Sequence, residues 1–287
     1  MPPESKAVAP AAAPRRREGP SASARSLLLT VLGEFVHPRR EPVWTSSLVS
    51  ALGLLGVEEK SARQALARSA AEGLIASRRH GRRVQWELTT DGSRLLEEGT
   101  QRIYGFMREG HRWDGRWLVL SVAIPEAQRQ LRHRLRARLT WLGLGSPTPG
   151  LWVTPHAAKE PEVAGVVAEM GLREQTYAWV GATSAVGNHT RLIDDAWRLD
   201  EVEALYHGFI SAFETRAARG DEQAFVAQVQ LVQEWRRFPA SDPNLPPELL
   251  DHAWPGPRAV AVFHDRHGRW DRAAQAQWDR LACLPQT

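Results

Sequence analysis

The feature that most constrains the fold of this chain is a cationic run between Lys60 and Arg83. The run holds seven Lys and Arg residues against one acid, Glu72, and carries a charge of +6, whereas the whole chain carries +4. The excess positive charge is therefore confined to one short segment. Positive charge concentrated on an ordered element is what phosphate binding requires. Holding like charges close together is also unfavourable unless an anion relieves the repulsion.

Three helices are predicted up to and within this run. Apolar residues recur at helical spacing from Ser26 to Val36, and Pro38 ends that helix. A second helix is expected over residues 45–55, and a third from about Glu58 to Gly73.

The third helix has two different faces. One face holds small or apolar residues: Ala62, Ala65, Leu66 and Ser69. The other face is mainly long-armed and polar: Lys60, Arg63, Gln64, Ala67 and Arg68. A helix fits the major groove of DNA, where Arg, Lys and Gln read base edges, so this face is typical of a recognition helix.

Two short strands follow the third helix. The pattern predicts strands over Ile75–Ser77 and Val84–Leu88 around a turn at His80 and Gly81, because glycine supports the positive φ of a tight hairpin. Four arginines lie at the tip: Arg78, Arg79, Arg82 and Arg83. They form either a solvated basic turn or a DNA-binding wing. The preceding helix favours the wing and predicts a winged helix-turn-helix that binds double-stranded DNA.

The middle of the chain alternates between strand and helix patterns. A helix over Thr90–Glu109 is expected to link the DNA-binding unit to a second domain that opens at Trp113. Strands are predicted over Trp117–Ile124, Leu151–Thr154 and Thr176–Ala182, and helices over Glu126–Leu142 and Glu162–Met170. This order favours a small ferredoxin-like unit whose last strand is hard to place.

The last third of the chain reads as helical. Helices are predicted over Leu192–Arg219 and from Asp221 to Trp235, followed by a Pro-rich loop and two short elements over Leu249–Trp254 and Ala259–Phe263. The predicted fold is therefore α+β and multidomain. Its divisions are a disordered Pro- and Ala-rich arm (1–24), a winged helix-turn-helix (25–100), a linker helix (101–112), a ferredoxin-like domain (113–190) and a helical C-terminal domain (191–287).

Composition places the chain among ordinary globular proteins. Its 287 residues favour two or three domains, and 43% hydrophobic and 24% charged residues are typical of soluble proteins. Cys283 is the single cysteine, which excludes an internal disulfide and a cysteine metal cluster and fits a reducing cytoplasm. The sequence contains no apolar run of membrane-spanning length, so no membrane partner is expected.

Three segments of the chain also carry a resemblance to a known family. They are RQALARSAAEGLIASRRHGRR at 63–83, WDGRWLVL at 113–120, and RRFPASDPNLPPELL at 236–250 with WPG at 254–256. In this order they resemble the PaaX family of bacterial phenylacetic-acid catabolic repressors. The resemblance covers roughly residues 25 to 265. The Pro- and Ala-rich arm and the tail after Asp265 depart from the family pattern.

The resemblance implies an N-terminal winged helix, a central domain with the fold of the CRISPR-associated integration endonuclease, and a helical C-terminal domain. It places Arg63 and Arg68 on the recognition helix, and Arg82 and Arg83 in the wing. It also implies a cytoplasmic homodimer that represses a phenylacetate-type catabolic operon. An aryl-CoA thioester such as phenylacetyl-CoA is the implied inducer. Such a repressor is not an enzyme and uses no cofactor.

Two other functions are alternatives to repression. A metal-dependent nuclease needs clustered carboxylates to hold Mg²⁺, but the strand Trp117–Ile124 has none, and only Asp114 and Glu126 flank it. No metal site or catalytic residue is predicted, since His264, His267 and Cys283 lack suitable neighbours. The other alternative is a module that binds nucleic acid without a small-molecule switch.

Two segments are candidates for binding an effector. Arg236 and Arg237 lie beside Trp235, Phe238 and the rigid Pro-rich loop, which together offer cations for phosphates and an apolar slot for an acyl group. The alternative is a structural loop in which either arginine pairs with Asp242. The second candidate is the arginine-rich helix 128–138, which includes Arg132 and Arg136 and is otherwise a solvated face.

Overall fold

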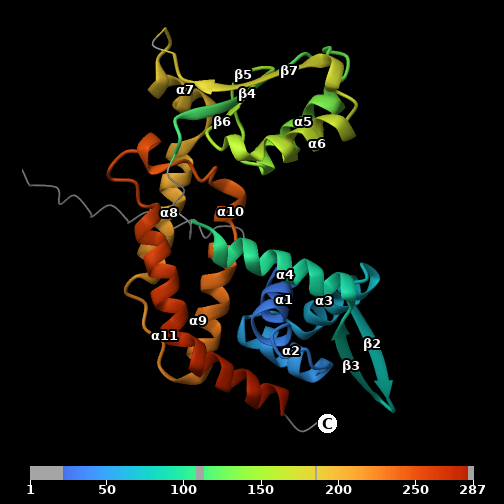
Figure 1. Cartoon of the computed structure of the whole chain (residues 1–287). Coiled ribbons are helices and arrows are strands. Elements are labelled where there is room, and N and C mark those ends of the chain that lie inside the picture. Colours follow the sequence, from blue (N-terminus) through green and yellow to red (C-terminus); the bar gives the residue numbers. More distant parts are fainter. Residues whose placement is uncertain (1–21, 108–112, 185, 284–287) are drawn as a thin grey trace, which may run out of the picture.

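The computed structural model describes residues 22–107, 113–184 and 186–283. Figure 1 shows three parts: an N-terminal unit, a central unit built on a sheet, and C-terminal helices that return to lie beside the N-terminal unit. The predicted arm falls mostly outside the described residues. Its last residue, Ala24, already belongs to the first helix, which Ser23 caps by accepting a hydrogen bond from Ser26 N.

The N-terminal unit consists of three helices and a small antiparallel sheet. Helix α1 (Ala24–Val31) continues into a π-helical turn (Leu32–Val36), and α2 (Thr45–Leu54) and α3 (Glu59–Ala71) follow. The strands are β1 (Val43–Trp44), β2 (Ile75–His80) and β3 (Arg83–Leu88), in the order β1-β3-β2. The apolar periodicity thus predicted the three helices correctly.

The β2–β3 hairpin is longer than the sequence predicts, and its turn lies one residue further on. His80 pairs with Arg83, so the two turn residues are Gly81 and Arg82. Gly81 has a φ of 63°, which is the left-handed conformation that favours glycine. A turn at His80 and Gly81 and a turn at Gly81 and Arg82 both contain the glycine, so the sequence does not distinguish them. The strand register does.

Helix α4 (Thr90–Gly105) leads from the hairpin toward the central unit. Thr89 caps it, and the cap holds the helix so close to the preceding turn that a Cβ on Gly92 would lie 1.9 Å from the carbonyl oxygen of Leu74. The helix ends at Gly105, before the predicted end at Glu109, because Phe106 has extended backbone angles. Part of the predicted linker, residues 108–112, lies outside the described residues.

The central unit has the ferredoxin-like order of elements. It runs β4 (Arg116–Val122), α5 (Arg129–Trp141), β5 (Gly145–Thr148), β6 (Leu151–Thr154), α6 (Glu160–Glu169) and β7 (Thr176–Ala182), with short 3₁₀ turns at Ala157–Lys159 and Arg173–Gln175. The antiparallel sheet has the order β5-β6-β4-β7. Helices α5 and α6 cover one face (Figure 1).

The strand that the sequence analysis did not predict is β5. Its sequence, Gly-Ser-Pro-Thr, has low strand propensity, so no local pattern reveals it. Tertiary packing fixes it instead, because a Cβ on Gly145 would lie 2.5 Å from the Trp197 ring and 2.8 Å from Ala196. Glycine at this position lets the strand approach α7 closely.

The C-terminal part differs from the prediction at three points. The helix predicted over Leu192–Arg219 is two helices, α7 (His189–Ala196) and α8 (Leu199–Phe213), because Trp197 is extended and buried between them. Helix α9 (Gly220–Trp235) follows, then short turns at Phe238–Ser241 (α10) and Pro247–Leu249. The short elements predicted after residue 249 are a loop and the start of one long helix, α11 (Gly256–Ala282).

The N-terminal unit and the C-terminal helices share one continuous apolar core. Phe35 of the N-terminal unit lies 4.9 Å from Phe225 of α9 and 5.7 Å from Trp278 of α11, measured between ring centroids. The central unit has a separate core between its sheet and helices, which includes Leu120, Leu139 and Val167. A smaller apolar cluster on the opposite face of the sheet joins Trp117 to Trp197 and to Leu245 of the Pro-rich loop.

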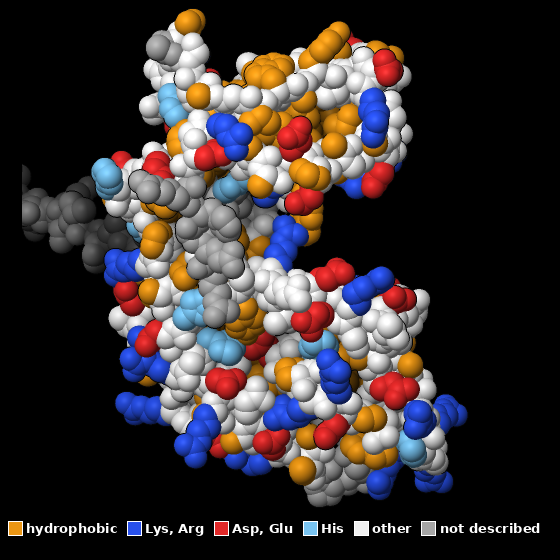
Figure 2. Space-filling model, viewed as in Figure 1, with side chains coloured by type: hydrophobic (Ala, Val, Ile, Leu, Met, Phe, Trp, Pro, Cys, Tyr) orange, Lys and Arg blue, Asp and Glu red, His pale blue; other side chains and the backbone are white. Residues whose placement is uncertain are grey.

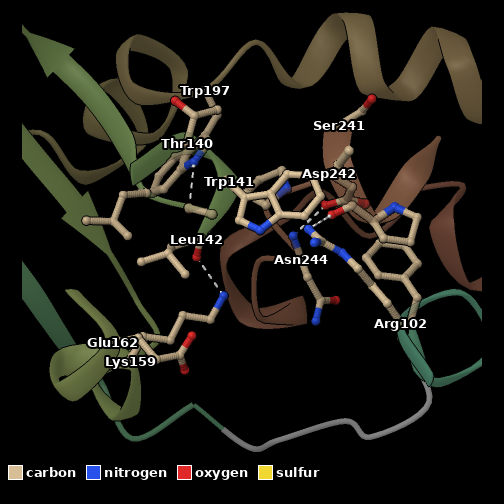
Figure 3. Close-up of a pocket in the computed structure, with 16 residues that line it drawn as sticks. Arg102, Thr140, Trp141, Leu142, Lys159, Glu162, Trp197, Ser241, Asp242 and Asn244 are labelled. Carbon is tan, nitrogen blue, oxygen red and sulfur yellow. Dashed lines mark hydrogen bonds between the residues drawn. The ribbon is translucent and has the colours of Figure 1, made fainter. Parts of the chain in front are cut away.

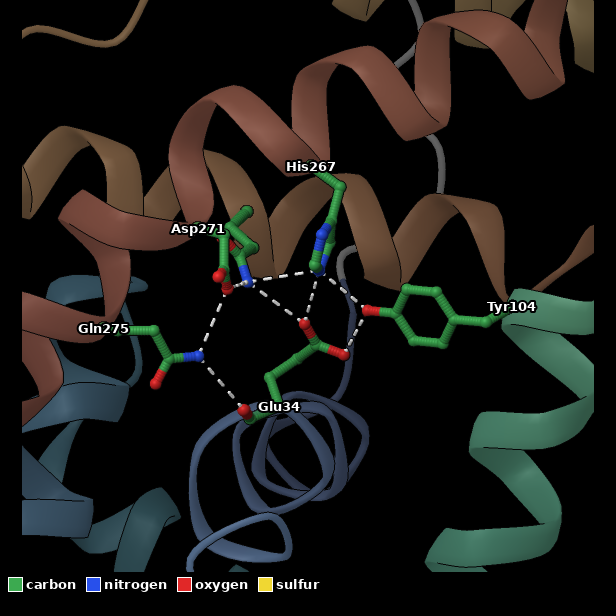
Figure 4. Close-up of polar contacts among 6 residues, drawn as sticks. Glu34, Tyr104, His267, Asp271 and Gln275 are labelled. Carbon is green, nitrogen blue, oxygen red and sulfur yellow. Dashed lines mark hydrogen bonds and ion pairs between the residues drawn. The ribbon is translucent and has the colours of Figure 1, made fainter.

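A polar cluster lies at the junction of the N-terminal unit with the C-terminal helices (Figure 4). It consists of Glu34, Tyr104, Gln228, His267, Asp271 and Gln275, and we call it the junction cluster. The Glu34 carboxylate accepts from Tyr104 OH at 2.7 Å and from Gln228 Nε2 at 3.1 Å, and lies 3.0 Å from His267 Nε2. Burial first, and then the Glu34 carboxylate, raise the pKa of Tyr104, so its hydroxyl remains a donor.

Candidate nucleic-acid interface and small-molecule pockets

Helix α3 presents the polar face that its sequence predicts. Its inner residues pack in the core of the unit: Ala62, Ala65, Leu66 and Ser69. Its outer residues are all exposed: Lys60, Arg63, Gln64, Ala67 and Arg68. Lys60, Arg63 and Gln64 also line a shallow depression on this face. The helix can therefore approach a partner along its polar face with small Ala67 at the centre.

Two acids shape the charge of α3, and one of them was missed by sequence reasoning. Glu59 lies just before the cationic run, and Arg63 Nε donates to its carboxylate at 2.8 Å. Glu72, the single acid inside the run, forms an ion pair with Arg25. Arg63 must therefore exchange Glu59 for any base or phosphate that it binds. The i,i+4 spacing of Glu59 and Arg63 is the sequence signal that indicates this pair.

The hairpin arginines point to both faces of the hairpin. In the β2–β3 register, Arg79 pairs with Val84 while Arg78 pairs with Gln85, so Arg78 and Arg79 lie on opposite faces, and Arg82 is in the turn. Arg78, Arg79, Arg82 and Arg83 are all exposed. Figure 2 shows Lys and Arg side chains around the lower right of the molecule, where Figure 1 places the hairpin. The tip can therefore contact anions from more than one side.

The base of the hairpin is fastened to α2. The indole Nε1 of Trp86 donates to Thr45 Oγ1 at 2.9 Å, and Thr45 Oγ1 donates to the Val84 carbonyl at 3.0 Å. The Trp44 ring also makes an edge contact with His80, at 5.6 Å between centroids. These contacts hold the cationic tip in a fixed position relative to the helices.

The residues predicted to bind an effector near the Pro-rich loop have structural partners. Trp235 and Phe238 are 1% and 3% exposed, and their rings pack together in the shared core. Arg236 donates to Ser26 O and Thr30 Oγ1 at 3.4 Å, and Arg237 forms an ion pair with Glu234. The alternative in which one of these arginines pairs with Asp242 is wrong, because Asp242 accepts from Tyr206 OH and from Asn244 N.

The arginine-rich helix α5 is largely a solvated face. Arg129, Arg132, Arg134, Arg136 and Arg138 are exposed. Arg132 donates to the Pro125 carbonyl at 3.3 Å, Arg136 lies 5.4 Å from the centroid of the Trp152 ring, and Arg138 pairs with Glu169. None of the described residues that line the two pockets below belongs to this arginine set.

The first pocket lies where the three parts of the chain meet (Figure 3). It encloses about 320 Å³ and is lined by α4, the end of α5, the start of α6 and residues 239–244. The Arg102 guanidinium lies 3.5 Å above the centroid of the Trp141 ring, and its Nη2 donates to the Pro239 carbonyl at 3.0 Å. Figure 2 shows a notch between the central and N-terminal units, with Lys or Arg atoms at its inner end.

Lys159 faces Arg102 from the other side of this pocket (Figure 3). Its ammonium donates to the Leu142 carbonyl at 2.7 Å. Burial lowers the pKa of Lys159, and burial also lowers the pKa of Arg102. Sequence reasoning missed both residues, because neither lies in a charged run or a motif.

A second and larger pocket adjoins the first. It encloses about 640 Å³ and shares Lys159 and Asn244 with its neighbour. Its remaining wall is largely apolar and includes Leu245, Pro246, Pro247, Leu250, Trp254 and Val260. Asn244 has a φ of 55°, a left-handed conformation that Asn tolerates better than most residues. The Pro-rich loop predicted to bind an effector thus lines both pockets, but its flanking arginines line neither. Arg236 and Arg237 line two other cavities, of about 470 and 750 Å³, between the N-terminal unit and the C-terminal helices.

Comparison with known proteins identifies the family. The PaaX-like protein model matches residues 23–92, the model of the PaaX protein central Cas2-like domain matches 110–193, and the PaaX-like protein C-terminal domain matches 197–280. The chain is 30% identical over 265 residues to the transcriptional repressor PaaX of Escherichia coli strain K12, covering 88% of this chain and 82% of that repressor. The chain belongs to the PaaX family.

The PaaX match extends further than the sequence segments indicated. The C-terminal family model continues to residue 280, so the tail after Asp265 does not depart from the family. The reason lies in α11, whose Trp270, Ala274 and Trp278 are buried in the shared core. The fold is also similar to that of the uncharacterized protein Rv0674 from Mycobacterium tuberculosis, with a TM-score of 0.62 and 21% identity over 90% of this chain and all of that one.

The central Cas2-like domain of this PaaX member does not gather carboxylates on β4. Asp114 accepts from the backbone N and the guanidinium of Arg116, and these hydrogen bonds lower its pKa. Within the described residues, no group of three or more His, Cys, Asp or Glu is placed to hold a metal ion. His267, which the sequence analysis considered as a metal ligand, instead contacts the Glu34 carboxylate in the junction cluster. No helix in the described ranges has the length and apolarity needed to cross a membrane.

Proposed function

We propose that this PaaX-family chain is a transcriptional repressor whose N-terminal unit is a winged helix-turn-helix that binds operator DNA. The observation that carries the proposal is the position of the cationic run. Its side chains lie on the exposed face of α3 and on the β2–β3 hairpin, two elements of one small unit. The similarity to a protein named as a transcriptional repressor supports the same function.

Each element has a role that follows from its geometry. Arg63 and Gln64 on α3 are proposed to read base edges in the major groove, with Lys60 and Arg68 on flanking phosphates. The hairpin is proposed to act as the wing, with Arg78, Arg79, Arg82 and Arg83 on phosphates or in the minor groove. Because these arginines face both sides of the hairpin, they suit a groove wall on each side of the tip.

Gel shift on the DNA upstream of the gene for this protein tests the proposal. Arg63→Ala is expected to weaken binding to the specific site by about 1–3 kcal/mol and to change random-DNA binding little. The matched control is Arg269→Ala, because Arg269 also has an exposed i,i+4 ion pair, with Asp265, on α11. Equal losses on both DNAs would show that Arg63 contacts only phosphate.

The wing is tested by salt dependence. Replacing Arg82 and Arg83 by Ala is expected to weaken binding to all sequences, and to flatten the slope of log K against log salt by about 0.9 for each phosphate that the variant no longer neutralises. An unchanged slope would remove the hairpin from the interface. Failure of the unaltered protein to shift any DNA fragment would overturn the repressor proposal itself.

We further propose that the repressed genes serve phenylacetate-type catabolism in the cytoplasm, and that an aryl-CoA thioester releases the repressor. A ligand releases DNA only if it binds the free protein more tightly than the DNA-bound protein, so DNA and inducer must weaken each other equally. Calorimetric titration of phenylacetyl-CoA onto the free protein and onto the operator complex measures this coupling. Identical affinities would exclude release by phenylacetyl-CoA.

We also propose that the repressor is a homodimer that pairs through the central unit. Strand β7 is at the edge of the sheet, and its Tyr177 and Trp179 are 72% and 52% exposed. Large exposed aromatic side chains on an unpaired strand edge are typical of interaction surfaces. Trp179→Lys is expected to shift sedimentation toward the monomer at micromolar concentration. A monomer for the unaltered protein, alone and on DNA, would refute the dimer.

A further inference from the structure

The two adjoining pockets at the meeting point of the three parts have complementary linings. The smaller one contains Arg102 and Lys159, and the larger one is mainly apolar. Lys159 and Asn244 line both, so they mark the boundary between a cationic space and an apolar space. A molecule that spans the boundary can place an anionic group on one side and an apolar group on the other.

Among the described residues, no carboxylate pairs with either of the two cations of the smaller pocket. In the described part of the chain, neither Arg102 nor Lys159 has an ion-pair partner, and each donates instead to a backbone carbonyl. Two acids line the same pocket. The Asp242 carboxylate already accepts two hydrogen bonds from other groups, and the charge of Glu162 raises the pKa of Lys159 less than burial lowers it. Partly buried cations that lack a paired opposite charge are the usual partners of a bound carboxylate or phosphate.

The sizes of the two spaces restrict the ligand. Pockets for small molecules enclose roughly 300–1,000 Å³, so the smaller pocket, at about 320 Å³, holds only a compact anionic group. The larger pocket, at about 640 Å³, has room for an aromatic ring and is lined by apolar side chains and by the Trp254 ring. An unsubstituted anion leaves this apolar space unfilled, and a neutral ring leaves the two cations uncompensated.

We propose that the two pockets together form the effector site of this protein, and that it binds an aromatic anion. The carboxylate or phosphate group lies between Arg102 and Lys159, and the aromatic group lies against the Pro-rich loop and Trp254. This inference rests on the proposed function as a repressor that responds to a small molecule. It differs from the sites that the sequence suggested, because Trp235, Arg236 and the α5 arginines do not form it.

The site also explains how a ligand can act on the DNA-binding unit. Arg102 is on α4, whose first turn is packed against Leu74 immediately before β2. The same side chain connects α4 to the central unit through Trp141 and to the C-terminal part through Pro239. An anion that draws the guanidinium away breaks both contacts. Occupancy of the pocket thereby changes how α4 is held between the three parts.

Calorimetry on the full chain tests the site with three probes: phenylacetyl-CoA, phenylacetate and coenzyme A. Arg102→Gln and Lys159→Gln are each expected to weaken binding of every probe that the unaltered protein binds, by at least about ten-fold, because each removes one charge-assisted hydrogen bond. Leu250→Asn is expected to weaken phenylacetyl-CoA and phenylacetate but to leave coenzyme A unchanged. Arg94→Ala, an exposed arginine on the same helix, is the matched control and is expected to change nothing.

The probes separate the two sources of the anion. Tight binding of phenylacetate alone indicates that the carboxylate is recognised, whereas binding that needs the coenzyme A phosphates indicates a thioester. The proposal is overturned if no probe binds the unaltered protein, or if Arg102→Gln and Lys159→Gln bind as tightly as Arg94→Ala. If either Gln variant fails to fold by circular dichroism, Trp141→Phe with tryptophan fluorescence replaces it. A smaller ligand-induced signal change is expected, because Trp197 and Trp254 also line the pockets and still respond, and a signal change of undiminished size overturns the site.

Failure of the site and failure of the repressor function give different results. If a probe binds and Arg102→Gln weakens it, but no DNA is shifted, the site stands and the repressor proposal fails. If phenylacetyl-CoA releases operator DNA from Arg102→Gln and Arg94→Ala at the same concentration, the repressor proposal stands and the site is wrong.

Discussion

The C-terminal part of the chain joins the other two parts in different ways. Its junction with the N-terminal unit is a continuous core in which Phe35, Phe225 and Trp278 pack ring against ring, with the junction cluster beside it. Its junction with the central unit combines a small apolar cluster around Trp117 and Trp197 with the two pockets. Both junctions contain cavities, and those beside the first are about 750 and 470 Å³, but only the first junction also has a large close-packed core.

This difference indicates which junction can respond to a ligand. A close-packed core has few alternative arrangements, because any shift opens voids and weakens the packing. A junction built around pockets is stabilised when a ligand fills them, so its two arrangements can differ in ligand affinity. We therefore expect the N-terminal unit and the helices α8, α9 and α11 to behave as one body, with the central unit adjusting relative to it.

The largest loss of stability is expected when an aromatic ring is removed from the core shared by the N-terminal unit and the C-terminal helices. Phe35→Ala removes a fully buried ring and should cost about 3–5 kcal/mol of unfolding free energy. Urea denaturation measures the loss. Hydrogen exchange should then speed up in α9 and α11 as well as in α1. Leu139→Ala in the separate core of the central unit is the control, and it should leave α9 and α11 protected. Unchanged exchange in α9 and α11 after Phe35→Ala would contradict a shared core.

A smaller loss is expected from the junction cluster. Glu34→Ala leaves Tyr104 OH, Gln228 and His267 without their common acceptor, and a buried group without a partner costs about 1–3 kcal/mol. We expect a total loss of about 2 kcal/mol by urea denaturation. Glu59→Ala, which removes an exposed carboxylate from α3, should stay within about 0.5 kcal/mol. Equal results for the two variants would show that the cluster does not fasten the junction.

Asp242 lies where the two junctions meet and gives a pH test. Burial raises its pKa, and its hydrogen bonds from Tyr206 and Asn244 offset this only in part. An acid whose pKa is raised on folding contributes stability that is present below about pH 4 and is lost as the pH rises through the folded value. The unfolding free energy of the unaltered protein should therefore fall relative to Asp242→Asn above that pH, by at most about 1.4 kcal/mol per pH unit. Parallel curves between about pH 4 and 7 would place Asp242 in contact with solvent.

The smallest effect is expected at the pocketed junction. Trp141 is 58% exposed, and its main contact is the Arg102 guanidinium, so Trp141→Ala should cost only about 0.5–1 kcal/mol. Solution scattering should nevertheless show a broader distribution of shapes, because the central unit loses a tie to α4. A loss of stability as large as that of Phe35→Ala would mean that the two junctions are equally packed.

Local pattern was sufficient for much of the fold. The two faces of α3 follow from a 3.6-residue period and were found at the expected residues. The hairpin follows from alternation around a glycine and was also predicted, although its turn lies one residue further on. The central order of strands and helices was also predicted, apart from β5. These features depend on residues that are close in the chain, where periodicity reports which side chains share a face.

Other features depend on residues that are distant in the chain. Strand β5 exists because Gly145 fits against Trp197, and the predicted helix over 192–219 breaks because Trp197 is drawn into the cluster around Trp117. The same holds for the tail, whose Trp278 is buried because the π-helical turn Leu32–Val36 and α9 lie beside it. Local periodicity does not predict these contacts, because they form between elements that are distant in the chain.

The candidate sites divide in the same way. The cationic residues proposed to bind DNA were determined by the sequence alone, because like charges on one helix and one hairpin are neighbours in the chain as well as in space. Arg102, Trp141 and Lys159 occupy three separate segments and have no common motif. Only the tertiary structure brings them to one pocket. Their partial burial, with no carboxylate of the described residues paired to either cation, is a property of the assembled junction and not of any segment in it.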